Sequence, residues 1–575
     1  MKKSYFLIIT LLSTIFGFGQ TNFYVSPTGN NTNNGTSQAT AWQTIQHAAN
    51  NAIPNSVVNI KAGIYNELVS INVNGTVGNN IVFKNYQNDV VIISGAGFTA
   101  SFSNLISINS KSNIEIDGLI LENLFAPFAN GILLVSNVGS GIENVTLKNL
   151  KIRNIRFTNV PNSTFPAPGD NAHGIEIYGK GISENDAIRN ITVENCEIYN
   201  NLNGYSENLT VNGNVVNFAL VNNSIHDNTN IGIDVAGNFG ASANPLLDHA
   251  RNGVIYKNTT YNNVSPVANS SGIYCDGCQN TVIERNISHH NTLGITVGCE
   301  QNGSTDNVSV INNLVYQNTY TGIQIGGYTT STTGIVNNSK IINNTCFHND
   351  LNNLHGEMLV AKVINCQIFN NIFNSSGTLL MYVENINPQN YTSNYNLFSS
   401  SSPLAVIPSV NYRFNTISYL DYQSNTSKDA NSILSFPNFV NPTNLDFHLQ
   451  ANSPAINAGD PSYVPLSTIF DIDDQNRANG IVDIGADEYY GNLEIKENKF
   501  QDFVIQPNPV KDFITIKFKK SKIENLEIYN SIGQLVKEVL ASNDSVIDVS
   551  DFSNGIYFIK LKNKNQILKF VFISL

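Results

Sequence analysis

Charged residues are scarce in this 575-residue chain, at 13% of the total. The 31 Lys and Arg are outnumbered by 43 Asp and Glu, which gives a formal net charge of −12 at pH 7. Nucleic-acid binding depends on clustered basic side chains, so this balance excludes nucleic acid as an expected partner. Intrinsic disorder is also disfavoured, because hydrophobic residues make up 41% of the chain.

Long apolar runs are lacking too, apart from one at the N-terminus. Lys2 and Lys3 supply a positive start, and the apolar stretch that follows, from Tyr5 to Phe18, is too short to cross a bilayer. We interpret residues 1–20 as a secretory signal peptide. The protein is therefore expected to be secreted, with no transmembrane segment.

The sequence is rich instead in a seven-residue phrase such as Asn-Asn-Leu-Val-Tyr-Gln-Asn. Its copies begin at Asp117, Lys148, Asn195, Asn222, Lys257, Arg285, Asn312, Asn343 and Asn365, between 22 and 47 residues apart. A short period built from β-branched residues and Asn or Gly turns predicts a parallel β-solenoid, whose coils bury apolar side chains against one another. The Asn at the second position of most copies predicts a ladder of stacked amides at one turn.

A second phrase, Gly-Ile-x-Ile or a variant of it, follows most copies of the first. Side chains alternate along a strand, so the residue between two apolar ones points away from the core. Stacking predicts one outward column. Its members are Leu133, Glu176, Ser206, Asp234, Tyr274, Thr296 and Gln324, with Asp276 two residues further along its own strand. Carboxylates on neighbouring coils would stand about 5 to 10 Å apart, close enough to act on one glycosidic bond.

Two long excursions leave the solenoid beside this column, at residues 155–172 and 237–252. Their length is typical of functional loops rather than of tight turns. We expect them to wall a groove along the sheet. Such a groove would suit a linear polymer.

Cysteine is limited to six residues. Cys278 and Cys299 fall at nearly equivalent points of adjacent coils, so whether they form a disulfide is left open. Cys196 and Cys366 are expected to be small buried hydrophobes.

The N-terminal part is expected to cover the open end of the solenoid. Residues 22–36 predict a strand and a Gly/Asn loop, and apolar residues at helical spacing between 42 and 52 predict a short helix. With Lys61-Ala-Gly-Ile-Tyr65, this opening resembles the N-terminal stretch of secreted right-handed parallel β-helix proteins, including pectate lyases of polysaccharide lyase family 9. The resemblance implies an all-β, right-handed parallel β-helix with an N-terminal capping helix, which we expect over residues 21–489 including its end caps.

The C-terminal part has a different pattern. Asp471, Asp473 and Asp474 lie in an element that closes the helix, and without a full EF-hand pattern they favour turn chemistry over Ca²⁺ binding. Residues 490–500 are a charged linker. Residues 501–575 contain Gln-Pro-Asn-Pro-Val, Tyr-Asn-Ser-Ile-Gly-Gln and Gly-Ile-Tyr-Phe between alternating strands. They resemble the type A sorting domain of the type IX secretion system, a small β-sandwich, which implies export to the cell surface or medium.

The outward column and its surroundings supply the candidate site. The catalytic candidates are Glu176, Asp234, Asp276, His249, Arg251 and Tyr274, and the substrate-binding candidates are His173, Glu300, Gln324 and Tyr328. Asp234 and Asp276 are also candidate Ca²⁺ ligands, because this ion takes hard oxygen donors. A base that removes a proton beside a carboxyl group would come from His249, Arg251, Tyr274 or Lys180. Lys257 resembles the catalytic lysine of family 9 lyases, but its place in the repeated phrase favours a structural role.

We therefore expect a secreted polysaccharide-active enzyme, with a lyase that cleaves a uronate-containing polysaccharide by Ca²⁺-assisted β-elimination as the leading hypothesis. A glycoside hydrolase that uses Glu176 with Asp234 or Asp276 is the alternative enzyme. A non-catalytic adhesin or glycan-binding rod would keep the repeats without needing clustered carboxylates. The expected partners are the polysaccharide and the type IX machinery, and the chain is expected to be a monomer.

Overall fold

The chain divides into two compact units, Met1–Tyr489 and Tyr490–Leu575. The computed structural model describes residues 19–160, 163–327, 333–384, 390–400, 409–412, 415–463, 469–477, 480–490, 503–506, 510, 512–518, 524–530, 534–542, 544–552, 555–562 and 567–572. The predicted signal peptide falls almost wholly outside these residues. Among the described helices, none is long and apolar enough to cross a membrane.

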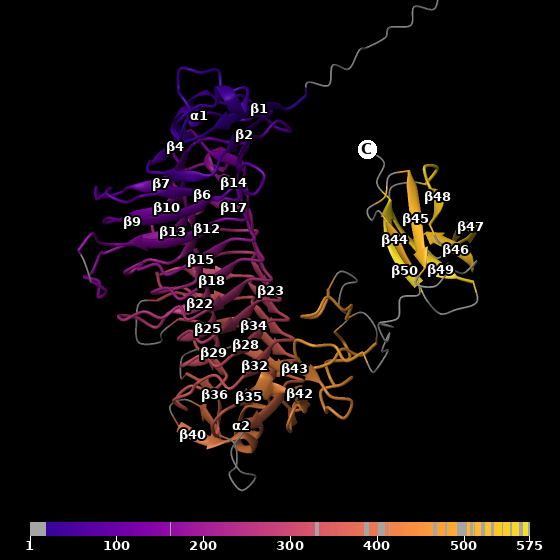
Figure 1. Ribbon diagram of the computed structural model, residues 1–575. Coiled ribbons are helices and arrows are strands. Elements are labelled where there is room, and N and C mark those ends of the chain that lie inside the picture. The colour runs from indigo at the N-terminus through magenta and orange to yellow at the C-terminus, as the bar shows by residue number, and fades with distance from the viewer. Residues whose placement is uncertain are drawn as a thin grey trace, which may run out of the picture. The chain divides into compact units, whose positions relative to one another are not determined.

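The first unit is a parallel β-helix, as predicted (Figure 1). Its coils contribute in turn to three long sheets, named sheet A, sheet B and sheet C in chain order. Each coil is a crossover between parallel strands, for which right-handed winding is the rule. Inward side chains from all three sheets fill one continuous apolar core.

Sheet A contains β1 (Thr21–Val25), β2 (Ser56–Ile60), β5 (Ile81–Asn85), β8 (Ile114–Asp117), β11 (Ile142–Lys148), β14 (Ile188–Glu194), β17 (Val215–Val221), β20 (Val254–Tyr256), β23 (Val282–Glu284), β27 (Ser309–Ile311), β31 (Lys340–Ile342) and β34 (Val363–Phe369). Both β30 (Ile335–Asn337) and β37 (Asn390–Asn394) pair with β34, and β26 (Ser304–Asp306) pairs with β30. Sheet B contains β3 (Gly63–Tyr65), β6 (Val91–Ser94), β9 (Ile120–Phe125), β12 (Lys151–Arg156), β15 (Glu197–Tyr199), β18 (Ser224–His226), β21 (Thr259–Tyr261), β24 (Ile287–His289), β28 (Leu314–Tyr316), β32 (Thr345–Phe347), β35 (Ile372–Ser375), β38 (Leu397–Ser400) and β41 (Ile433–Leu434). Sheet C contains β4 (Val69–Ile71), β7 (Asn104–Asn109), β10 (Ala129–Ser136), β13 (Ala172–Gly179), β16 (Leu209–Gly213), β19 (Ile233–Ala236), β22 (Ser271–Asp276), β25 (Leu293–Gly298), β29 (Thr321–Ile325), β33 (Met358–Val360), β36 (Leu379–Val383), β39 (Ser409–Tyr412) and the antiparallel β40 (Asn415–Ser418).

A buried Asn ladder follows the turn between sheets A and B. Its members are Asn223, Asn258, Asn286, Asn313, Asn344, Asn371 and Asn396, and each side-chain oxygen accepts the backbone N–H of the equivalent residue one coil earlier. The last copy of the phrase is out of register with our prediction, because Asn371 rather than Cys366 occupies the ladder. The left-handed residue of each turn is the one before the ladder Asn, for example Asn222 at φ 53°.

A second ladder, after sheet B, contains Asn201, Asn228, Asn263, Asn291, Asn318 and Asn349. Both ladders end on a carboxylate, at Glu357 for Asn349 and at Asp429 for Asn396. Most amides in a ladder donate to the amide oxygen of the next coil, so the last amide needs an acceptor beyond the ladder. The carboxylate at the end is that acceptor, and it has no N–H of its own to satisfy.

Helices close both ends of the core. At the N-terminal end, α1 (Ile45–Asn51) buries Ile45, Ala48 and Ala49, and the Glu67 carboxylate accepts the N–H groups of its first turn. This confirms the predicted capping helix. At the other end, α2 (Tyr419–Thr426) buries Tyr419 and Tyr422 beside β39 and β40.

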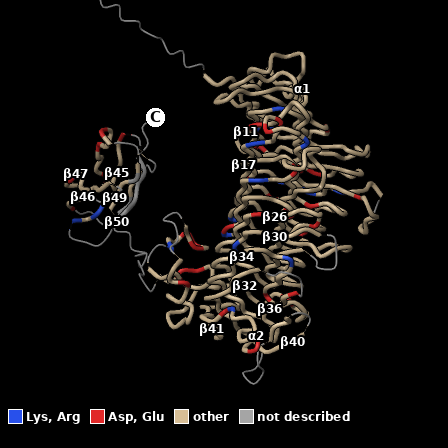
Figure 2. Tube along the Cα trace, turned by 180° about the vertical axis from the view of Figure 1, so that it is seen from behind, with Lys and Arg blue, Asp and Glu red and all other residues tan. Residues whose placement is uncertain are grey.

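The segment after α2 folds back along the β-helix. Its strands β42 (Phe439–Asn441) and β43 (Asp446–Leu449) pack apolar side chains against the outer face of sheet B. Asp474 bonds Lys257 at 2.5 Å and Arg285 at 2.6 Å. Both basic residues stand at left-handed turn positions where other coils carry Asn, so Lys257 has the structural role that its place in the phrase favoured. Figure 2 shows how thinly charges are spread over the coils.

The second unit has its own apolar core between two antiparallel sheets. One sheet contains β44 (Phe503–Gln506), β45 (Phe513–Phe518) and β48 (Ser545–Asp548), and the other contains β46 (Glu524–Asn530), β47 (Leu535–Ala541), β49 (Gly555–Leu561) and β50 (Ile567–Phe572). This is the predicted β-sandwich.

Candidate functional site

The outward column of sheet C brings remote residues into register. Glu176 pairs with Thr210, Thr210 with Asp234, and Asp234 with Tyr274. The column continues from Tyr274 through Thr296 to Gln324. Ser206 was predicted to occupy the place that Thr210 has. The difference arises because the Gly204 phrase forms a turn with Gly204 at φ 70°, so that the strand β16 begins only at Leu209.

A cluster of four carboxyl groups lies along this column. Asp234 is 5% exposed and Asp276 is 2% exposed, and they stand on the adjacent strands β19 and β22. Asp276 accepts the backbone N–H of Glu300 at 2.6 Å. One carboxylate oxygen of Asp234 is buried and has no hydrogen-bond partner among the described residues. Asp234, Asp276, Glu300 and Glu207, the last from the turn before β16, form what we call the acidic cluster.

Burial and mutual repulsion control the ionisation of the acidic cluster. Burial first, then the charges of Glu207, Asp276 and Glu300, raise the pKa of Asp234 well above its ordinary value. The pKa of Asp276 is also raised well above its ordinary value, by burial and by Glu300. Glu300 is exposed, but the protein around its carboxyl group displaces part of its hydration. This desolvation, followed by the charge of Glu207, raises the pKa of Glu300. Binding of a cation or of protons would therefore stabilise the acidic cluster.

Tyr274 stands in this cluster as a neutral phenol that resists ionisation. Burial, followed by the neighbouring carboxylates of Asp276, Glu300 and Asp234, raises the pKa of its phenol well above 10.0. A phenol that resists ionisation is poorly suited to remove a proton from substrate.

His173 links two acids at the N-terminal side of the cluster. Its Nδ1 lies 3.8 Å from Glu176 Oε2 and its Nε2 lies 3.6 Å from Glu207 Oε2. Its Nδ1 also lies 3.1 Å from Asn130 Oδ1. Burial alone would lower the pKa of His173, but the two carboxylates more than offset it, so the pKa is raised.

A surface pocket of about 350 Å³ opens over β7, β10 and β13. His173, Glu176 and Lys180 line it, together with aromatic, amide and aliphatic side chains. The pocket lies next to the acidic cluster, because Glu176 and Glu207 both contact His173. Sheet C thus combines a pocket and a row of carboxyl groups along one face.

The loop over residues 237–252 carries two of the predicted bases, and contacts within the loop and with Glu184 and Asn214 hold them. The imidazole of His249 lies 3.0 Å from the Leu246 carbonyl, and burial lowers its pKa. Arg251 donates to Glu184 at 2.8 Å and to Asn214 at 3.1 Å. These contacts fix the loop, and they do not bring either side chain to the acidic cluster.

The remaining sequence-predicted residues are placed as follows. Gln324 is buried near the C-terminal end of the column, with its side-chain oxygen unpaired among the described residues. Tyr328 lies outside the described residues. Cys278 and Cys299 are buried free thiols rather than a disulfide. Cys196 and Cys366 are also buried, as expected.

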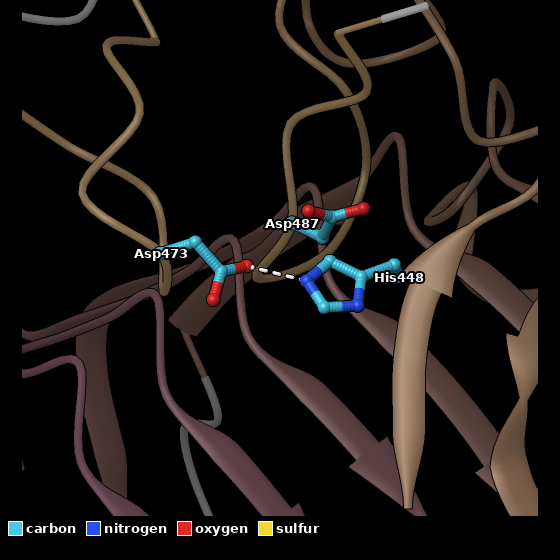
Figure 3. Close-up of side chains that lie close together, drawn as sticks. All are labelled: His448, Asp473 and Asp487. Carbon is cyan, nitrogen blue, oxygen red and sulfur yellow. Dashed lines mark hydrogen bonds and ion pairs between the residues drawn. The ribbon is translucent and has the colours of Figure 1, made fainter. Parts of the chain in front are cut away.

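One group of side chains in the described residues has metal-like convergence, and it lies away from sheet C. The ligand atoms of His448, Asp473 and Asp487 all lie within 4.8 Å of one another (Figure 3). Hydrogen bonds to Asp473 and Asp446, against the opposing effect of burial, raise the pKa of His448 to about 10. With His448 protonated, the group forms a salt bridge in the closing segment. The nearby Asp471 accepts backbone N–H groups of its own turn, as predicted from the incomplete calcium pattern.

Sequence reasoning missed Glu207 and the exposed pair Phe102 and Phe128 in the pocket. Glu207 belongs to a phrase that we interpreted as a strand, and its position became clear only when that phrase proved to be a turn. The two Phe residues belong to coils that precede or barely enter the regular repeat. Their signal was a pair of phenylalanines at equivalent places just before two successive strands of sheet C.

Comparisons with known proteins address both units. Residues 504–574 match the family described as secretion system C-terminal sorting domain. The protein is therefore a type IX export substrate that is secreted or attached to the cell surface. Over 482 residues the chain is 32% identical to the uncharacterized protein YwoF of Bacillus subtilis (strain 168), with 79% of this chain and 99% of YwoF covered. The chain belongs to the YwoF family.

Several solved structures are similar to this YwoF family member. Pectate lyase Pel9A is 16% identical with a TM-score of 0.48, over 81% of this chain and 96% of that one. The GH136 lacto-N-biosidase of Eubacterium ramulus is 12% identical with a TM-score of 0.47, over 66% and 67% of the two chains. The A-module of the mannuronan C-5 epimerase AlgE6 of Azotobacter vinelandii is 15% identical with a TM-score of 0.44, over 61% and 86%.

Proposed function

We propose that the protein is a secreted enzyme that cleaves a uronate-containing polysaccharide by Ca²⁺-assisted β-elimination. The observation that carries the proposal is the buried carboxylate of Asp234, which faces other carboxyl groups and leaves one oxygen unpaired among the described residues. A buried negative charge needs either a cation or a proton. The acidic cluster lies on a face that also carries a pocket of the size of a sugar unit.

The ligand chemistry of the cluster suits Ca²⁺, although among the described residues no three of its carboxyl groups bring their oxygens as close together as His448, Asp473 and Asp487 do. All four groups offer carboxylate oxygens, the ligand type that this ion prefers, and the unpaired oxygen of Asp234 marks an unmet requirement. Asp234 and Asp276 would hold the ion, with Glu207 and Glu300 adding negative charge. When bound, the ion supplies positive charge beside a substrate carboxylate.

The remaining chemistry falls to side chains in the pocket. In β-elimination a base takes the proton beside the uronate carboxyl group, the bond to the leaving sugar oxygen breaks, and a carbon–carbon double bond forms. Of the bases considered from the sequence, Lys180 is the one that lines the pocket. We assign it the proton-accepting role. His173, held by Glu176 and Glu207, would orient the sugar.

The test is incubation of the purified protein with polygalacturonate and with alginate. We expect ultraviolet absorbance from unsaturated chain ends to rise, to stop when a Ca²⁺ chelator is added, and to return when Ca²⁺ is restored. A neutral polysaccharide that lacks uronate is the control. No absorbance with any uronan would contradict the lyase proposal.

One observation favours a glycoside hydrolase as the second candidate. The raised pKa of Asp234 favours the protonated carboxyl group that a general acid needs, while Glu176 on the same column can act as its partner. The same incubations separate the two. New reducing ends without absorbance, insensitive to the chelator, would indicate hydrolysis. Binding without either product would indicate a glycan-binding rod.

A further inference from the structure

Two phenylalanine rings form an exposed stack at the outer end of the pocket. The centroids of Phe102 and Phe128 lie 4.5 Å apart with 6° between the ring planes. Phe102 is 68% exposed and Phe128 is 36% exposed. They come from the turns before β7 and β10, on adjacent coils, and both line the pocket that contains His173 and Glu176.

The backbone at both positions adopts a conformation that bulky residues rarely adopt. Phe102 has φ 63° and Phe128 has φ 55°, in the left-handed region. They are the two phenylalanines with positive φ among the described residues, where most residues in this conformation are Asn or Gly. Left-handed backbone costs about 1 kcal/mol or more at a bulky side chain, and Asn would relieve it. Backbone strain of this kind clusters at functional sites.

Polar groups connect the two rings to the candidate catalytic residues. Asn104 Nδ2 donates to the Phe102 carbonyl at 3.1 Å, and Asn130 donates to Asn104 Oδ1 at 2.9 Å. His173 then lies 3.1 Å from Asn130 Oδ1. The three polar side chains are in register on β7, β10 and β13. A row of amide and imidazole groups therefore leads from the rings toward the acidic cluster.

We propose that Phe102 and Phe128 form a stacking platform for one sugar ring of the polysaccharide, with Asn104 and Asn130 bonding its hydroxyl groups. An exposed flat apolar surface beside hydrogen-bonding amides matches a pyranose, which has an apolar face and a polar edge. The platform is a subsite on the N-terminal side of the acidic cluster. The proposal rests on the proposed function, because it takes the polysaccharide of that site as its ligand.

The test measures binding of polygalacturonate and of alginate by affinity electrophoresis, in an Asp234→Asn background that prevents turnover. The double variant Phe102→Leu/Phe128→Leu keeps apolar bulk but removes the flat rings. We expect it to bind about tenfold more weakly to the uronan that the parent retains, because a well-packed aromatic contact is lost. Tyr at both positions should restore binding. Phe436→Leu, at an exposed Phe in the closing segment, is the matched control.

A second variant separates ligand binding from folding. Phe102→Asn suits the left-handed backbone, so we expect an unchanged or higher thermal midpoint together with weaker uronan binding. Full-strength binding by the double Leu variant, or no retention of either uronan by the parent and by the wild-type protein, would overturn the platform. Ring-dependent binding without any cleavage product from the wild-type protein would support the platform and reject the lyase. Unchanged binding by the double variant, with unchanged cleavage when the same two Leu substitutions are made in the wild-type protein, would reject the platform and support the lyase.

Discussion

The outer faces of sheets B and C are built on the same coils but differ in how their side chains are satisfied. On sheet B, the rings of Tyr199, His226, Tyr261, His289 and Tyr316 stack at 4.6 to 5.3 Å with 1° to 10° between planes. Each ring finds its partner one coil away. On sheet C, the equivalent column mixes carboxyl, hydroxyl, phenol and amide groups, and Asp234 finds no such partner among the described residues.

This difference distinguishes a column of side chains that stabilises the fold from a column that is a candidate functional site. A column of like side chains stabilises the stack with contacts that it supplies itself. A column of unlike side chains with repelling charges gains no such stabilising contacts from the stacking of coils. Its raised pKa values show that the β-helix holds these groups together at a cost in stability. The residues of sheet C are therefore the ones to test for function, and those of sheet B and the Asn ladders are the ones to test for stability.

The largest expected effect is on turnover, from Asp234→Asn. The amide cannot supply negative charge to a cation or a proton to a leaving group, so we expect activity to fall about a thousandfold. The folded pKa of Asp234 is raised above its unfolded value, so its ionisation destabilises the fold as pH rises, and Asn should leave the thermal midpoint unchanged or higher. Asp227→Asn, at an exposed acid beside sheet B, is the control. Unchanged turnover in Asp234→Asn would remove the site.

The next effect is on stability, from Asn286→Ala in the ladder. Asn286 is fully buried, accepts from Asn258 and donates to the Ile255 carbonyl, so its removal leaves buried groups unpaired on two coils. We expect the free energy of unfolding to fall by about 2–5 kcal/mol, with turnover per folded molecule unchanged. The measurement is urea unfolding of the full chain. Asn72→Ala, at an exposed Asn with one hydrogen bond, should cost less than about 1 kcal/mol. Equal losses would refute the ladder's role.

The repeats made most of the β-helix predictable from sequence. A strand period fixes which side chains face out, so Glu176, Asp234 and Tyr274 were placed in one column before the register was known. The export signal was equally predictable, because the sorting-domain motifs lie at specific points in the last 75 residues.

The candidate site was only partly predictable, because its remaining parts come from irregular turns. Glu207 lies in an irregular turn, and its position depends on where that turn ends and the next strand begins. Phe102 and Phe128 occupy equivalent positions before the paired Asn104 and Asn130, but they lie where the repeated phrases have barely begun. Arg251 and His249 were proposed as bases from residue type alone. Sequence does not reveal that hydrogen bonds within the loop and to Glu184 occupy them.

The smallest expected effect sharpens the comparison most, because one residue type should respond to pH in opposite ways on the two faces. On sheet C, the folded pKa of His173 is raised above 6.5, so its contribution to stability is full at acidic pH and is lost as pH rises through the folded value. On sheet B, burial and then His290 lower the pKa of His289 to about 4, so stability is lost as pH falls from 6.5 toward that value.

We therefore expect the advantage of wild type over His173→Gln to shrink from mildly acidic to alkaline pH. The advantage of His289→Phe, which keeps a stacked ring, over wild type should grow as pH falls. Each difference should be about 1 kcal/mol or less, because both side chains keep some contact with water. Thermal midpoints of the three proteins across this pH range give both slopes in one experiment. When each difference is taken as wild type minus variant, the two slopes against pH should have opposite signs. Slopes of the same sign would mean that the carboxylates of Glu176 and Glu207 do not act on His173, and the two faces would then be electrostatically alike.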